Sequence, residues 1–90
     1  VRISAQVEAF LGRLPPEPRK KLRAALVALG KSAGDIKPLE NELAGFHRLR
    51  VGRYRVVFCY AAPDTVDCVY AEERRIVYEV FAALLRERLE

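Results

Sequence analysis

The pattern of apolar and polar residues divides this chain into a helical first part and a strand-forming second part. Residues 1–3 alternate weakly and predict a short edge strand, and Ser4 fits a helix N-cap. Helical spacing of apolar residues then predicts a short helix, ended by Pro15-Pro16, and a second helix that reaches about Leu29. The apolar positions of these helices are Val7, Phe10, Leu11, Leu14, Leu22, Ala25, Leu26 and Leu29.

From residue 46 onward the apolar period changes to two. Residues 46–51 and 54–60 alternate on either side of a turn at Gly52-Arg53, and a strand over 66–71 follows a turn at Pro63-Asp64. Such short connections predict an antiparallel meander. Residues 31–44 are expected to form a surface linker. A last amphipathic helix carries Ile76, Val77, Val80, Phe81, Leu84 and Leu85, so the order of elements predicts an α+β fold with the helices packed on one sheet face.

The composition fits one globular domain over residues 1–90. The 90 residues are 51% hydrophobic and 31% charged, and no apolar run approaches the roughly 20 residues of a membrane helix. Without a signal-peptide pattern, we expect a soluble cytoplasmic protein that does not bind membranes. Cys59 and Cys68 lack metal-ligand spacing, and in a reducing compartment they are expected to be free thiols. Phosphate-loop and dinucleotide motifs are also absent, so we expect neither a metal nor another cofactor.

The charge distribution is more informative than the net charge of +4. Residues 45–63 contain four arginines and no acid. A two-residue turn at Gly52-Arg53 places Arg50 opposite Arg55, with Arg48 on the same face, while Leu49, Val51, Tyr54, Val56 and Phe58 form the core face. Directly opposed arginines repel, and a polyanion bound to this face would relieve the repulsion. The structural alternative is a solvated face on which the arginine stems cover apolar area.

The third strand extends this register. A turn at Pro63-Asp64 would place Cys59 opposite Cys68 and Val57 opposite Tyr70. Cys68 and Tyr70 would then lie on the face that carries Arg48, Arg50 and Arg55, which we call the arginine face. Tyr70 then either stacks on a base or packs under the last helix. Beyond the strand, Arg74 and Tyr78 can return to the rim of the arginine face. The alternatives are a solvated turn for Arg74-Arg75 and core packing for Tyr78.

Three segments of the chain form a recognisable set: Lys37-Pro38-Leu39, the hairpin from Gly45 to Phe58, and Arg74-Arg75-Ile76-Val77-Tyr78. Together they resemble the RelE/ParE toxin superfamily, and in particular its RelE-type mRNA interferase branch. The resemblance implies a RelE-like toxin domain and a metal-independent endoribonuclease that cuts mRNA, in many members on the ribosome. It also implies a cognate antitoxin as partner, and two assemblies are open: a homodimer or a toxin–antitoxin hetero-oligomer.

The resemblance assigns roles by position. Arg48 and Arg50 would bind RNA phosphates, while the catalytic residues would be Arg55, Arg74 and Tyr78. Arg53 stands where the family commonly has an acidic or small turn residue, and with Arg75 it is a further phosphate-binding candidate because of its charge. The RNA 2′-hydroxyl would attack the adjacent phosphorus, and arginines would stabilise the charge on the phosphoryl oxygens.

The chain departs from the family pattern just before Arg74. Glu72 and Glu73 stand where the family often has a glycine and a basic residue or histidine. A carboxylate there either acts as a base or weakens RNA binding, so Glu73 is a candidate modulator of RNA binding or cleavage. Tyr70 is a second candidate, because it could stack on a base. Two alternatives remain open: a ParE-like toxin that inhibits DNA gyrase, and a non-catalytic protein that binds RNA or an antitoxin.

Overall fold

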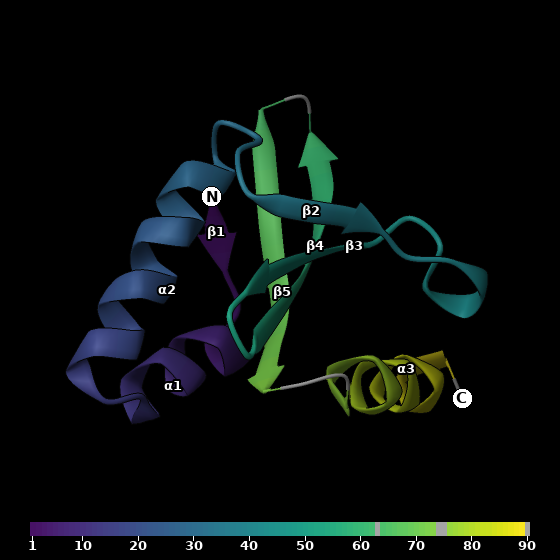
Figure 1. Ribbon diagram of the computed structural model, residues 1–90. Coiled ribbons are helices and arrows are strands. Elements are labelled where there is room, and N and C mark those ends of the chain that lie inside the picture. The colour runs from purple at the N-terminus through teal and green to yellow at the C-terminus, as the bar shows by residue number, and fades with distance from the viewer. Residues whose placement is uncertain (63, 74–75, 90) are drawn as a thin grey trace.

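The computed structural model describes residues 1–62, 64–73 and 76–89, in which a five-stranded sheet carries helices on both faces (Figure 1). The order in the sheet is β1-β5-β4-β3-β2, with β1 parallel to β5 and the other neighbours antiparallel. The predicted α+β class, meander and short edge strand are therefore confirmed. The strands are β1 (Arg2–Ile3), β2 (Asp35–Pro38), β3 (His47–Val51), β4 (Tyr54–Ala62) and β5 (Thr65–Glu73).

The helices α1 (Ala5–Arg13) and α2 (Pro16–Leu29) cover one face of the sheet. The Ser4 hydroxyl oxygen accepts a hydrogen bond from the Val7 amide at 3.2 Å, which confirms the predicted N-cap. Arg19 donates to three carbonyls at the end of α1 and so ties the two helices together. The main core lies between these helices and the sheet and contains Val7, Phe10, Leu11, Leu14, Leu22, Leu26, Leu29, Leu49, Val56, Phe58, Val66, Cys68 and Ala71.

The helix α3 (Ile76–Leu89) packs on the opposite face, so the expectation that all helices share one face is wrong. The centre of the sheet is apolar on both sides, because Val57 alternates with the core residues Val56 and Phe58. Phe81 and Ala82 of α3 bury this second apolar area, together with Leu43. No helix in the described part of the chain has the length and apolarity to cross a membrane.

The predicted linker over residues 31–44 is wrong as well. It contains β2 and a short 3-10 helix, η1 (Asn41–Leu43). β2 pairs with β3, with Asp35 opposite Arg50 and Lys37 opposite Arg48. This strand has only one half-buried residue, Ile36, so its alternation is too short to be seen in the sequence.

An irregularity in β5 changes the faces of the two cysteines. Val57 pairs with Tyr70 as predicted, but Phe58 pairs with Cys68, which leaves Val69 as an extra residue on β5. The bulge moves Cys68 into the main core, so its predicted place on the arginine face is wrong. Cys59 lies opposite Asp67 and not opposite Cys68, and both thiols are free.

Candidate functional site

The β3–β4 hairpin has the register that the sequence predicts. Gly52 has a φ of 59°, the left-handed conformation that a two-residue hairpin turn requires. Arg50 lies opposite Arg55, and Arg48 lies opposite Val57. Since paired residues share a face of the sheet, the three arginines lie together on the face that α3 crosses. His47 is on the other face, where it stacks on Phe58.

Two carboxylates lie on this face beside the arginines. Across β2, β3, β4 and β5, the paired residues Asp35, Arg50, Arg55 and Glu72 form a line that we call the charged row. The neighbouring row consists of Lys37, Arg48, Val57 and Tyr70. The sequence argument that no acid balances the arginines is therefore wrong. The basic excess on the face is smaller than residues 45–63 alone suggest.

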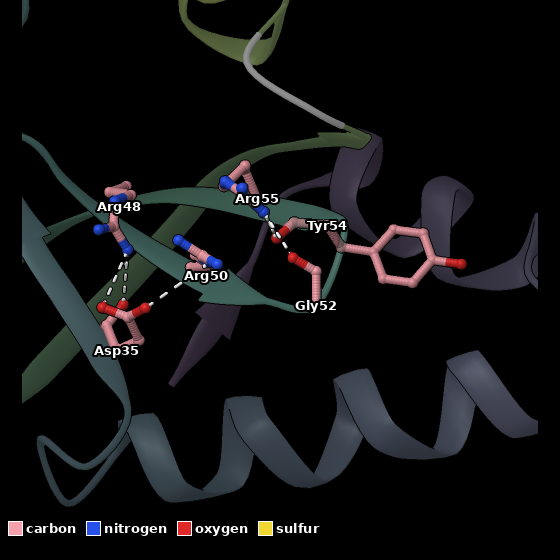
Figure 2. A network of polar contacts seen from close by, with 6 residues as sticks. All are labelled: Asp35, Arg48, Arg50, Gly52, Tyr54 and Arg55. Carbon is pink, nitrogen blue, oxygen red and sulfur yellow. Dashed lines mark hydrogen bonds and ion pairs between the residues drawn. The ribbon is translucent and has the colours of Figure 1, made fainter.

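Arg48 is held by Asp35. Its Nη1 atom lies 3.2 Å from Asp35 Oδ1 and also donates to the Asp35 backbone carbonyl at 3.1 Å (Figure 2). Only 15% of the Arg48 side chain is exposed. These contacts join β2 to β3 and leave little of Arg48 available to a ligand.

Arg50 and Arg55 are held less completely. Arg50 is 55% exposed, and its Nε atom lies 3.9 Å from Asp35 Oδ2. The Arg55 Nη1 atom donates to the carbonyls of Gly52 and Tyr54 at 2.8 and 3.0 Å (Figure 2). A guanidinium has five N–H donors, so both side chains keep donors for an incoming anion. Two adjacent planar cations of this kind suit the oxygens of a phosphate.

The other predicted polar residues differ in placement. Arg53 is exposed in the hairpin turn, and its Nη1 atom lies 3.9 Å from Glu73 Oε1. Glu73 pairs with Tyr54, so it lies toward the α1 face and outside the charged row. Of these two adjacent glutamates, Glu72 is the one that belongs to the charged row. The candidates Arg74 and Arg75 lie outside the described residues.

The two candidate tyrosines pack in the apolar cluster between α3 and the sheet. The Tyr70 ring lies 6.1 Å from that of Phe81, which fits the alternative in which Tyr70 packs under the last helix. Burial, and then the Glu72 carboxylate, raise the pKa of Tyr70 above its usual value. Tyr78 is half-buried in the first turns of α3, as its core-packing alternative expects.

A groove of about 710 Å³ lies on the same face beside α3. None of its lining residues is a lysine or an arginine, so it does not extend the cationic surface. Among the described residues, no group of three His, Cys, Asp or Glu side chains could hold a metal ion. The groove is lined by Ser4, Ala5, Gln6, Phe46, Cys59, Val69, Tyr70, Phe81, Leu84, Leu85 and Glu87.

Sequence reasoning missed Asp35 and Lys37 and listed Glu73 in place of Glu72. The strand period gives a signal for Glu72, because it is two residues beyond Tyr70 on the same strand. Asp35 has no local signal, since only the pairing of β2 with β3 brings it to the arginines.

Two solved structures resemble most of this chain in fold. A chain of the RelB-RelE antitoxin-toxin complex from Methanococcus jannaschii aligns with a TM-score of 0.70 and 22% identity, over 90% of this chain and 99% of that one. A chain of the RelBE2 toxin-antitoxin complex from Mycobacterium tuberculosis aligns with a TM-score of 0.65 and 27% identity, over 81% and 94%. No protein-family model and no curated protein sequence matches the chain. The chain therefore has a RelE-like fold.

Proposed function

We propose that this protein is the toxin of a toxin–antitoxin pair and a metal-independent endoribonuclease that cleaves mRNA on the ribosome. Support comes from the RelE-like fold and from the directly opposed Arg50 and Arg55. The opposed pair is the observation that carries the proposal, because Arg50 and Arg55 keep N–H donors that can bind the oxygens of one phosphate. Such a protein acts in the cytoplasm, and its partners are mRNA, the ribosome and a cognate antitoxin.

In the proposed reaction the RNA 2′-hydroxyl attacks the adjacent phosphorus, and the 5′-oxygen of the next nucleotide leaves. Negative charge grows on the phosphoryl oxygens during attack. Arg55, with Arg50 beside it, donates hydrogen bonds to these oxygens, and loss of one such donor would cost about 3–4 kcal/mol of transition-state stabilisation. The resemblance adds Arg74 at the scissile phosphate and Tyr78 as a proton-transfer group. Glu72, which lies opposite Arg55, is a second candidate for accepting the 2′-hydroxyl proton.

The test adds purified protein to translating ribosomes and maps mRNA 5′ ends. We expect cuts in phase with codons that disappear in Arg55→Ala and Arg74→Ala. Arg23→Ala is the matched control, since Arg23 is exposed on α2 at the other face of the molecule and should retain cleavage. Intact mRNA with the folded wild-type protein would overturn the nuclease proposal. If gyrase is arrested in the same preparation, the ParE-like alternative replaces it.

A non-cleaving RNA-binding role is the second candidate. The charged row favours it, because Asp35 and Glu72 place two carboxylates beside the arginines. Carboxylates repel phosphate. They would destabilise the transition state more than the bound substrate, because the phosphoryl oxygens carry more negative charge in the transition state. RNA binding without cleavage, with and without ribosomes, would select this role.

A further inference from the structure

At the β2 end of the charged row, the Asp35 carboxylate already forms ion pairs with two of the arginines. Asp35 contacts both Arg48 and Arg50, with one oxygen toward each side chain (Figure 2). An RNA phosphate would approach the same face with the same charge and hydrogen-bonding pattern. The carboxylate and the phosphate therefore compete for the same donors.

The two contacts of Asp35 differ in strength. The Arg48 contact is short, nearly buried and reinforced by the Asp35 backbone carbonyl. The Arg50 contact is 3.9 Å long, and both side chains are more than half exposed. Exposed ion pairs of this length contribute little to stability and are readily exchanged. A ligand can thus take Arg50 from Asp35 while Arg48 stays in place.

We propose that Asp35 is a positioning residue that limits RNA affinity by competing with phosphate for Arg50. In the free protein Asp35 retains Arg48 as a link between strands and draws Arg50 toward β2. When a phosphodiester binds between Arg50 and Arg55, the Arg50 guanidinium turns from the carboxylate to the phosphate. Phosphate binding is then assigned to the Arg50–Arg55 pair, and Arg48 has a structural role. This inference rests on the proposed function, because it assumes that RNA binds the arginine face.

The probe is a short, fluorescent 2′-O-methyl RNA strand, which binds but cannot be cleaved by 2′-hydroxyl attack. Its affinity is measured by fluorescence anisotropy at about 0.1 M salt, where the Debye length is about 10 Å. Asp35→Asn keeps the shape and an acceptor oxygen for Arg48 but removes the charge. We expect it to bind the probe about three- to tenfold more tightly than wild type, since one nearby charge at the surface accounts for about 1 kcal/mol.

The matched control is Asp64→Asn. It makes the same chemical change at an exposed residue in the β4–β5 turn, at the far end of β4 from Gly52. We expect at most a small gain in affinity from this control, because surface charges farther apart than about 10 Å are largely screened at moderate salt.

A double-mutant cycle separates competition from general repulsion. If Asp35 acts through Arg50, its substitution should gain little in an Arg50→Ala background. An equal gain in that background, or no gain from Asp35→Asn alone, would overturn the inference. In either case the cleavage assay decides the proposed function separately: it stands if codon-phased cuts are lost in Arg55→Ala, and it fails if the folded wild-type protein leaves mRNA intact. Asp35→Ser repeats the comparison should Asp35→Asn fail to fold.

Discussion

The two faces of the β3–β4 hairpin carry different side chains. One face lies under α1 and α2 and carries Leu49, Val56 and Phe58. The other face, which α3 crosses, carries Arg48, Arg50 and Arg55. The first face is closed by two helices over an apolar core. The second is divided between the apolar cluster under α3 and the charged row. One alternating pattern thus supplies both the stability of the sheet and its cationic surface. Substitutions on the two faces should affect different measurements.

The largest expected effect is on stability at the closed face. Phe58 is fully buried, so Phe58→Ala should lower the free energy of unfolding by about 3–5 kcal/mol. Phe81→Ala is the matched substitution on the other face. It should cost at least about 1 kcal/mol less, because the smaller cluster under α3 can close around the gap more easily. Urea unfolding of both variants measures the difference, and equal losses would contradict it.

The two cysteines extend the comparison to pH. Burial raises the pKa of the Cys68 thiol from 9.0 to about 11, while Cys59 lies in the groove beside α3. Between these pH values the unfolded chain loses the Cys68 proton and the folded chain keeps it, so stability falls as pH rises. The Cys68 contribution is complete below pH 9 and should fall by about 2 kcal/mol by pH 11.

The measurement is urea unfolding of wild type and Cys68→Ala between pH 8 and 11. The variant should lose less stability over this range, since it lacks the titrating group. Cys59→Ala is the control and should retain most of the wild-type slope, because Cys59 is only half-buried. A Cys68→Ala slope equal to that of the wild type would show that Cys68 is not the cause.

Arg48 and Arg50 should differ in stability although they share a strand and a face. Arg48→Ala removes a nearly buried side chain and its two contacts with Asp35, and we expect a loss of about 1–2 kcal/mol. Arg50→Ala removes one long, exposed contact and should change stability by less than about 0.5 kcal/mol. Thermal unfolding checks both. A larger loss in Arg50→Ala than in Arg48→Ala would mean that Arg50, and not Arg48, has the structural role.

The hairpin could be predicted from sequence because its information is local. Gly52 allows the turn, and the alternating residues 46–51 and 54–60 on either side of it fix which side chains share a face. Cys68 could not be placed in this way. From the sequence, side chains 66–70 are expected to alternate between the two faces of the sheet without interruption. The extra residue, Val69, results from packing, because Val69 and Tyr70 both contact the apolar cluster under α3. A pattern of neighbouring residues therefore does not predict this bulge.

Asp35 shows a second limit of local patterns. Its segment has too few apolar residues to form a strand alone, and β3 supplies the hydrogen bonds that make it one. The sequence therefore does not predict that the Asp35 carboxylate lies beside Arg48 and Arg50. The sequence predicted where the cations lie but not what neutralises them.

The smallest expected effect separates Glu72 from Glu73. They are adjacent in sequence, but Glu72 pairs with Arg55 in the charged row and Glu73 pairs with Tyr54 on the other face. Glu72→Gln should tighten binding of the 2′-O-methyl RNA probe about two- to threefold, since it removes a carboxylate beside the phosphate site. Glu73→Gln makes the same change one residue later and should leave the affinity within about twofold of wild type, because that carboxylate lies toward the other face of the sheet and beside Arg53. If Glu73→Gln tightened binding and Glu72→Gln did not, RNA would be bound at the hairpin turn beside Arg53, and the charged row would not be the binding surface.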